Sequence, residues 1–216
     1  MQYQISINAK KLTSGLTWAA AALLLVHGAL SAWNYLVARV PWYLRDFFDV
    51  DMEENLPTWF SGFILLVATT FLWILMREKA AKGDPMAGRW KLLFVGFCFL
   101  SIDEIAGFHE TVNTLITPSW AWGGAAISLG LLIYFRSFLQ SLPMKIAVGF
   151  LVAGALYVGG AVGMEFVGEP IPADTLLYKM TTLVEEGGEM FGVILFIRTL
   201  LNYMESPALV IGVKRK

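Results

Sequence analysis

Three carboxylates and a histidine fall within eight residues of the segment SIDEIAGFHE, residues 101–110. They are Asp103, Glu104, His109 and Glu110, and they directly follow the apolar run LLFVGFCFL. Carboxylate and imidazole side chains bind divalent metal ions, and they also relay protons inside membrane proteins. This segment therefore predicts a polar site in apolar surroundings.

A second group of acids occurs near the end of the chain, in the segment LVEEGGEMFG. If the two segments form antiparallel membrane helices, we expect their acids to lie at the same depth in the bilayer. Glu165, from the preceding apolar segment, is expected at that depth as well. The predicted ligands of this shared site are Asp103, Glu104, His109, Glu110, Glu165, Glu185, Glu186 and Glu189.

Helical phase divides the first segment into faces. At about 100° per residue, Asp103 and Glu110 differ by roughly 20° and share an inward face, whereas Glu104 points about 100° away. We expect Phe97, Phe108 and Leu115 to face lipid or neighbouring helices.

The positive charge near these carboxylates is too small to balance them. His109 lies among them and Lys179 lies at the rim, so the remaining compensation must come from protons, bound cations or both. An interpretation without a ligand is a water-filled vestibule in which some of these acids are protonated.

The first hypothesis for the acidic site is a divalent metal ion such as iron, manganese or zinc. Glutamates from several helices form dinuclear carboxylate centres in some helical bundles. The Glu-x-x-His motif of those proteins is not matched, because Ala106 stands three residues before His109. Such a centre could act in redox chemistry on a lipid-soluble substrate, but no residue identifies a catalytic step.

Two alternatives stay open beside the metal hypothesis. One is a proton- or cation-coupled transporter, since Asp, Glu and His inside a membrane form ion pathways. The other is a structural or accessory subunit of a membrane complex, and the chain could also form an oligomer.

The composition indicates a membrane protein. Of 216 residues, 57% are hydrophobic and 15% are charged, whereas soluble domains carry about 25% charged residues. The net charge of −1 gives no basis for nucleic-acid binding, and no phosphate-binding loop indicates a nucleotide. The expected partner is membrane lipid.

The hydrophobic pattern predicts a single all-α domain over residues 1–216, a bundle of six transmembrane helices. A spanning helix needs about 20 predominantly apolar residues. The expected helices cover roughly 15–38, 57–76, 92–117, 120–139, 144–166 and 177–202. The first of these is expected to be a retained anchor rather than a signal peptide, because of its length.

The connection over residues 40–57 mixes aromatic and acidic residues, which predicts a short interfacial helix after the first span. Its DVDMEE stretch resembles the start of a calcium-binding loop. It lacks the required glycine and final glutamate, so we expect a solvated acidic loop there.

The distribution of Lys and Arg predicts the orientation. With the amino terminus inside, thirteen basic residues lie on the cytoplasmic side and three, Arg39, Arg45 and Lys179, lie outside. Both termini are therefore expected in the cytoplasm of a bacterial cell, with the protein in the plasma membrane.

The other histidine, His27, lies in the middle of an apolar segment. Two histidines could hold haem through axial imidazoles, but the predicted depths of His27 and His109 differ by about half a leaflet. The sequence argues against haem and favours a packed, hydrogen-bonded His27.

Overall fold

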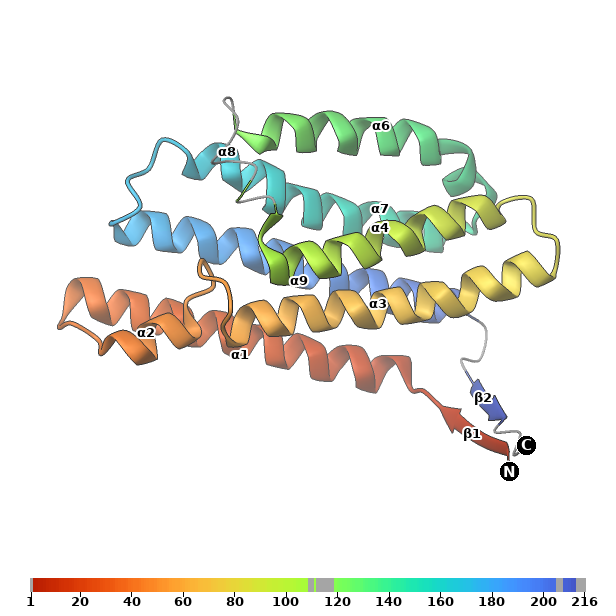
Figure 1. Cartoon of the computed structure of the whole chain (residues 1–216), viewed down its shortest axis with the longest axis horizontal. Helices are drawn as coiled ribbons and strands as arrows, with labels where there is room; N and C mark the ends of the chain where they lie inside the picture. Colours follow the sequence, from red (N-terminus) through yellow and green to blue (C-terminus); the bar gives the residue numbers. More distant parts are fainter. Residues whose placement is uncertain (1, 109–110, 112–118, 205–207, 213–216) are drawn as a thin grey trace.

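The computed structural model describes residues 2–108, 111, 119–204 and 208–212. Long helices lying side by side make up most of the molecule, which confirms the predicted helical fold (Figure 1). The described elements, in chain order, are β1 (Gln2–Ser6), α1 (Ala9–Leu36), α2 (Trp42–Phe48), α3 (Leu56–Ala81), α4 (Ala87–Ala106), α6 (Trp120–Ser141), α7 (Met144–Val158), η1 (Gly159–Met164), α8 (Glu165–Gly168), α9 (Leu176–Tyr203) and β2 (Ala208–Gly212).

Side-chain caps fix where several helices begin. The Oδ1 atom of Asn8 accepts a hydrogen bond from Lys11 N at 2.9 Å, and Asn55 and Thr175 cap α3 and α9 in the same way. A cap of this kind satisfies a backbone N–H that has no partner within the helix.

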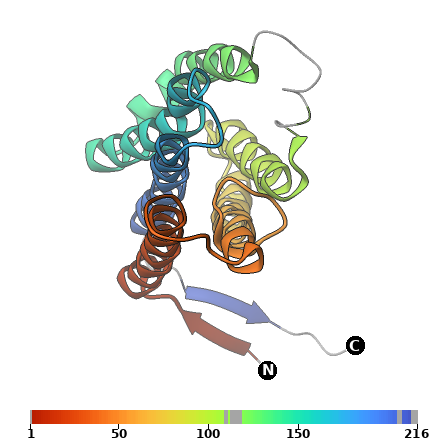
Figure 2. The ribbon, with the colours of Figure 1, turned by 90° about the vertical axis from the view of Figure 1, so that its left-hand side faces the viewer.

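The helix α9 lies at the centre of the bundle. It packs against α1, α3 and α7, while α4 packs mainly against α3, and α6 lies beyond α7. Seen along the bundle, α3 and α4 lie beside one another and opposite the row formed by α1, α9, α7 and α6 (Figure 2). The buried core includes Leu72, Ile197 and Leu200.

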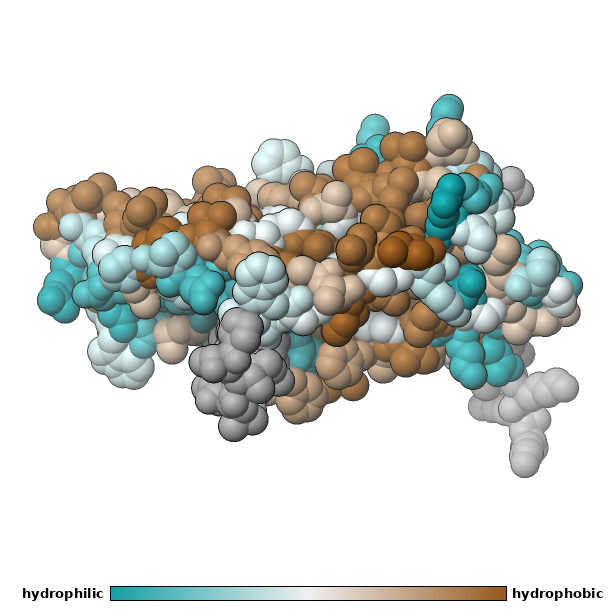
Figure 3. Space-filling view, turned by 90° about the horizontal axis from the view of Figure 1, so that it is seen from above, coloured by the Kyte–Doolittle hydropathy of each residue, from teal (hydrophilic) through white to brown (hydrophobic). Residues whose placement is uncertain are grey.

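Four helical segments among the described residues are long and apolar enough to cross a membrane: α1, α3, α6 and the continuous run Met144–Gly168. Hydrophobic residues cover much of the face seen in Figure 3. On α6, Ile127 and Ile133 are among the most exposed large apolar side chains. These features are those of a membrane protein, whose apolar surface faces lipid.

The helix α4 ends earlier than the sequence predicts. The expected helix extended to residue 117, but α4 ends at Ala106 and Gly107 has φ 59°, in the left-handed region. The Glu53 side chain lies against Gly107, in the space where a Cβ atom would stand. Glycine has no Cβ, so it both adopts this backbone conformation and admits that close approach.

The helix that contains Gly160 is also irregular. It continues from α7 through η1, a π-helical turn, into α8. A Cβ atom on Gly160 would lie 2.5 Å from the carbonyl oxygen of Glu185 in α9. The two backbones can therefore approach this closely only because glycine stands at this position.

The two ends of the chain form a feature that the hydrophobic pattern does not predict. The strands β1 and β2 pair in an antiparallel ribbon, with Gln2 opposite Gly212 and Ser6 opposite Ala208. This ribbon lies beside the helical bundle, at one end of the molecule (Figure 1).

Candidate functional site

The acids predicted from the sequence are brought together mainly from α4 and α9. Glu104 of α4 interacts electrostatically with both Glu186 and Glu189 of α9. Glu185 interacts with the same two glutamates, and Asp103 interacts with Glu189. All five side chains are partly buried. Acidic side chains thus lie close together between two helices that are about 80 residues apart in the sequence.

The face of α4 that meets α9 is that of Glu104, not the face predicted from Asp103. The rings of Phe97 and Phe196 stack with their centroids 4.3 Å apart, so Phe97 faces α9. Glu104 follows Phe97 by seven residues and differs from it by about 20° around the helix. Phe97 thus meets a neighbouring helix, one of the two surroundings expected for it, and Phe108 is exposed; Leu115 lies outside the described residues.

A tyrosine that the sequence analysis did not select completes this acidic site. Tyr157 in α7 is partly buried and lies close enough to Glu189, Glu104, Glu186 and Asp103 to interact with them electrostatically. Tyr157 lies two residues before the π-helical segment that packs on Glu185 and Glu189. Its only signal in the sequence is position, three residues before Gly160 in a segment of small residues. We use the name acidic site for Asp103, Glu104, Glu185, Glu186 and Glu189, with Tyr157.

Glu165 has a different partner. Its Oε1 atom accepts a hydrogen bond from Ser119 Oγ at 3.3 Å, at the start of α6. The contacts described for Glu165 thus join α8 to α6, and they do not place it with the acids of α9.

Two of the predicted ligands, His109 and Glu110, lie outside the described residues. Within the part of the chain that the structure describes, no group of three or more His, Cys, Asp or Glu side chains is arranged to hold a metal ion. The acidic site described above is therefore a set of interacting carboxylates rather than a formed coordination sphere.

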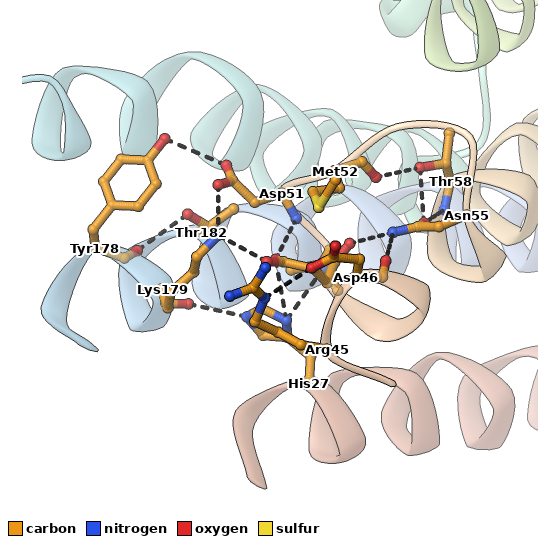
Figure 4. A network of polar contacts seen from close by, with 12 residues as sticks. His27, Arg45, Asp46, Asp51, Met52, Asn55, Thr58, Tyr178, Lys179 and Thr182 are labelled. Atoms are coloured by element: carbon orange, nitrogen blue, oxygen red, sulfur yellow. Dashed lines mark hydrogen bonds and ion pairs between the residues drawn. The ribbon is translucent and has the colours of Figure 1, made fainter. Parts of the chain in front are cut away.

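A separate polar network joins α1, α9 and the segment before α3 (Figure 4). The Nζ atom of Lys179 donates to Asp49 Oδ2 and to Asp51 Oδ2, each at 2.8 Å. The side chains of Lys179 and Asp49 are only 15% and 5% exposed. The hydroxyl of Tyr178 donates to Asp51 Oδ1 at 3.3 Å. Lys179 therefore forms ion pairs with both aspartates.

This network corrects the expectation of a solvated acidic loop over DVDMEE. Asp49 is buried, and the amide of Asn55 donates to the carbonyl oxygens of Asp46 and Asp49, at 2.9 and 2.6 Å. The Lys179 ammonium occupies the position that a cation would take between Asp49 and Asp51. The sequence signal for this arrangement was weak, because the partners lie almost 130 residues apart.

His27 is the packed, hydrogen-bonded residue that the sequence favours. It is 2% exposed, and its Nδ1 atom accepts from the backbone N–H of Val50 at 3.2 Å. Its Nε2 atom lies 3.4 Å from the Lys179 carbonyl oxygen. Since Nδ1 accepts, Nε2 carries the proton and donates to that carbonyl, as in a neutral imidazole. Both ring nitrogens are engaged, which removes His27 as a haem ligand in this arrangement.

Arg45 lies beside this network on α2. Its Nε atom donates to Asp46 Oδ1 at 2.8 Å. This hydrogen bond raises the pKa of the guanidinium above its usual value, and the nearby charges of Asp46 and Asp49 act in the same direction. Arg45 therefore keeps its charge at every physiological pH.

The comparisons with known proteins give one match. A family model described as Domain of unknown function (DUF8692) matches residues 16–204, a range that contains α1 to α9 almost entirely. No curated protein and no solved structure matches the chain.

Proposed function

Since the chain belongs to this family, Domain of unknown function (DUF8692), we propose its function from its own acidic site. The protein is a multi-pass membrane protein that binds a divalent metal ion between α4, α7 and α9. Its helices α4 and α9 cross the membrane beside the four apolar segments, which makes six crossings, and α2 lies at the membrane surface.

One observation supports this proposal above the others: Glu104 stands opposite Glu186 and Glu189, and the largest electrostatic interactions of these two glutamates are with other carboxylates. An acid at the centre of a membrane helix costs about 2.5–3.5 kcal/mol on the insertion scale. Carboxylates gathered on several helices raise that cost, because their charges repel. A divalent cation removes the repulsion and uses the same oxygen atoms as ligands.

Lys179, which the sequence analysis placed at the rim of the acidic site, has other partners. Lys179 donates to Asp49 and Asp51, and these aspartates already balance its charge. The positive charge of Lys179 is therefore shared with the aspartates before α3 rather than with the glutamates of α9.

A second candidate is a proton- or cation-coupled transporter. The proximity of Tyr157 to Glu189 favours it, because neighbouring protonatable side chains inside a membrane can relay protons. The third candidate, an accessory subunit, is favoured by the exposed apolar side chains of α6.

Elemental analysis together with a melting series separates these candidates. The variant Glu189→Gln mimics a protonated acid. If a metal ion is bound, purified protein contains stoichiometric metal, and Glu189→Gln lowers both the metal content and the Tm. Chelator lowers the Tm of the original protein, because a ligand stabilises only the fold that binds it.

If protons neutralise the acidic site instead, Glu189→Gln preserves or raises the Tm near neutral pH and chelator changes nothing. Glu169→Gln is the matched control, since Glu169 is an exposed acid outside the acidic site. A stabilised Glu189→Gln variant that is indifferent to chelator would end the metal proposal and favour proton-coupled transport.

A further inference from the structure

A small polar pocket opens between α1, α2 and α9, at the end of the bundle that carries α2. Its volume is about 170 Å³. We propose that this pocket binds a phosphoethanolamine group, the zwitterionic phosphate and amine of a membrane lipid headgroup. The proposal concerns a different place from the acidic site and does not depend on what that site binds.

Hydrogen-bond donors from one face of α1 line the pocket. Ser31, Asn34 and Tyr35 have the spacing of neighbours on a helix surface. Ser31 is 6% exposed, and its hydroxyl makes no hydrogen bond to any described residue. The Asn34 Oδ1 atom accepts from Val40 N at 3.0 Å, which fixes the amide and leaves its NH₂ group for another acceptor. The Ser31 hydroxyl lines the pocket and can donate to a bound phosphate oxygen.

Two cations line the same pocket. The Arg45 side chain is 44% exposed, and its contact with Asp46 uses only the Nε–H donor. The remaining guanidinium donors form a fork that suits a phosphate. Lys179 gives two of its three ammonium hydrogens to Asp49 and Asp51, and the described contacts leave the third for a ligand.

The acids of the pocket determine which kind of phosphate it fits. Asp46 and Asp49 balance Arg45 and Lys179, so the lining is close to neutral. A purely anionic ligand would add negative charge that this neutral lining does not compensate. A ligand that carries an amine as well as a phosphate can place its ammonium against Asp46, whose described side-chain contact is with Arg45 alone.

The surroundings and the size of the pocket favour a headgroup over a larger molecule. Pockets for drug-sized ligands measure about 300–1,000 Å³, well above this one. The adjoining helix α2 exposes Trp42, Tyr43 and Phe47, and aromatic side chains of this kind gather at the level of lipid headgroups. Acyl chains would remain outside, along the exposed apolar end of α1.

Calorimetric titration of the full-length protein in detergent tests the proposal. The probes are dihexanoyl phosphatidylethanolamine, free O-phosphoethanolamine and dihexanoyl phosphatidylglycerol. We expect saturable binding of the first, with one site per chain. Arg45→Gln should weaken it roughly tenfold, through loss of a charge-assisted hydrogen bond. Arg39→Gln is the matched control, an exposed arginine nearby that does not line the pocket, and should leave the affinity unchanged.

The second variant, Asp46→Asn, tests the amine half of the ligand. It should weaken phosphatidylethanolamine more than phosphatidylglycerol, because only the former donates to Asp46. Comparable affinity for free O-phosphoethanolamine would identify a soluble ligand, and binding of the lipid alone would identify the membrane as the source; both support the pocket. Three outcomes overturn the proposal: no saturable binding of either amine probe, equal losses in Arg45→Gln and Arg39→Gln, or phosphatidylglycerol bound as tightly as phosphatidylethanolamine.

Discussion

At the scale of single residues, the buried charges before α3 depend on one side chain, Lys179, which joins Asp49 and Asp51. Acids in an apolar chain stand out by type alone, so the sequence selects Glu104, Glu186 and Glu189 as candidate members of one site, and their shared role stays a prediction. Their partners were not predictable, because helical phase gives directions around one helix and not which neighbour lies there. Lys179 shows this limit: it was expected near the glutamates, and the fold places it between Asp49 and Asp51.

Replacing Lys179 by Met should destabilise the protein strongly. The change leaves Asp49, which is 5% exposed, and Asp51 as unbalanced charges. Loss of one partner from a buried ion pair costs about 3–5 kcal/mol. Denaturant unfolding in detergent micelles measures the difference in the free energy of unfolding.

The control for this experiment is Lys82→Met. Lys82 pairs with Glu78 on the surface of α3, where both side chains are well exposed, so we expect a change of at most about 0.5 kcal/mol. The double variant Lys179→Met with Asp49→Asn should recover part of the loss, because it removes one unbalanced charge. Equal losses for Lys179→Met and Lys82→Met would show that the buried network contributes nothing to stability.

At the scale of elements, the sequence predicted the positions of the helices better than the points where a helix ends or becomes irregular. The expected helix over 120–139 matches α6 (Trp120–Ser141) within two residues at its end. The expected helix over 92–117 does not match α4, because Gly107 turns the backbone into the left-handed region. Glycine is common within membrane helices, so its presence alone could not reveal this break. The π-helical turn η1 was equally hidden, since it depends on packing against α9.

The close approach of α7 and α9 should be sensitive to one methyl group. In Gly160→Ala, the new Cβ would lie 2.5 Å from the Glu185 carbonyl oxygen, and backbone cannot move aside as a flexible side chain does. We expect a loss of about 1–3 kcal/mol, the usual cost of overpacking. Thermal unfolding of the purified protein provides the measurement.

Gly154→Ala provides the comparison within α7. A Cβ at Gly154 meets nothing within 4 Å, so this variant should keep the original stability or gain slightly from better helix propensity. Because Glu189 Cγ also lies near Gly160, Gly160→Ala should disturb the acidic site as well. An unchanged Tm in Gly160→Ala would contradict the close packing of the two helices.

At the scale of the whole molecule, the membrane location is supported by the four apolar segments, while the direction of insertion depends on charge. Basic residues gather on the connection between α3 and α4, at the opposite end of the bundle from α2. The positive-inside rule predicts that connection on the cytoplasmic side. The sequence allows this prediction because Lys and Arg contribute through their number near the membrane, without any knowledge of contacts, and the direction of insertion stays to be tested.

Cysteine labelling in intact cells tests the direction of insertion. In a Cys98→Ser background, Lys82→Cys should be protected from a membrane-impermeant reagent, and Arg39→Cys should react. Both positions are exposed and neither takes part in the buried network around Lys179. After the cells are opened, both should react, which controls for accessibility. The reverse pattern in intact cells would show that the protein has the opposite orientation in the membrane. The proposed phosphoethanolamine pocket would then lie at the cytoplasmic surface.

The pairing of β1 with β2 has a consequence for how often the chain can traverse a bilayer. Two strands that share one ribbon, Gln2 opposite Gly212 through Ser6 opposite Ala208, must lie on the same side of the membrane. A path that starts and finishes on one side makes an even number of passages, whatever its direction. Parity therefore excludes three or five traversals and allows four or six. If α4 traverses the bilayer, α9 must do so too, and the carboxylates that each helix carries enter the membrane together.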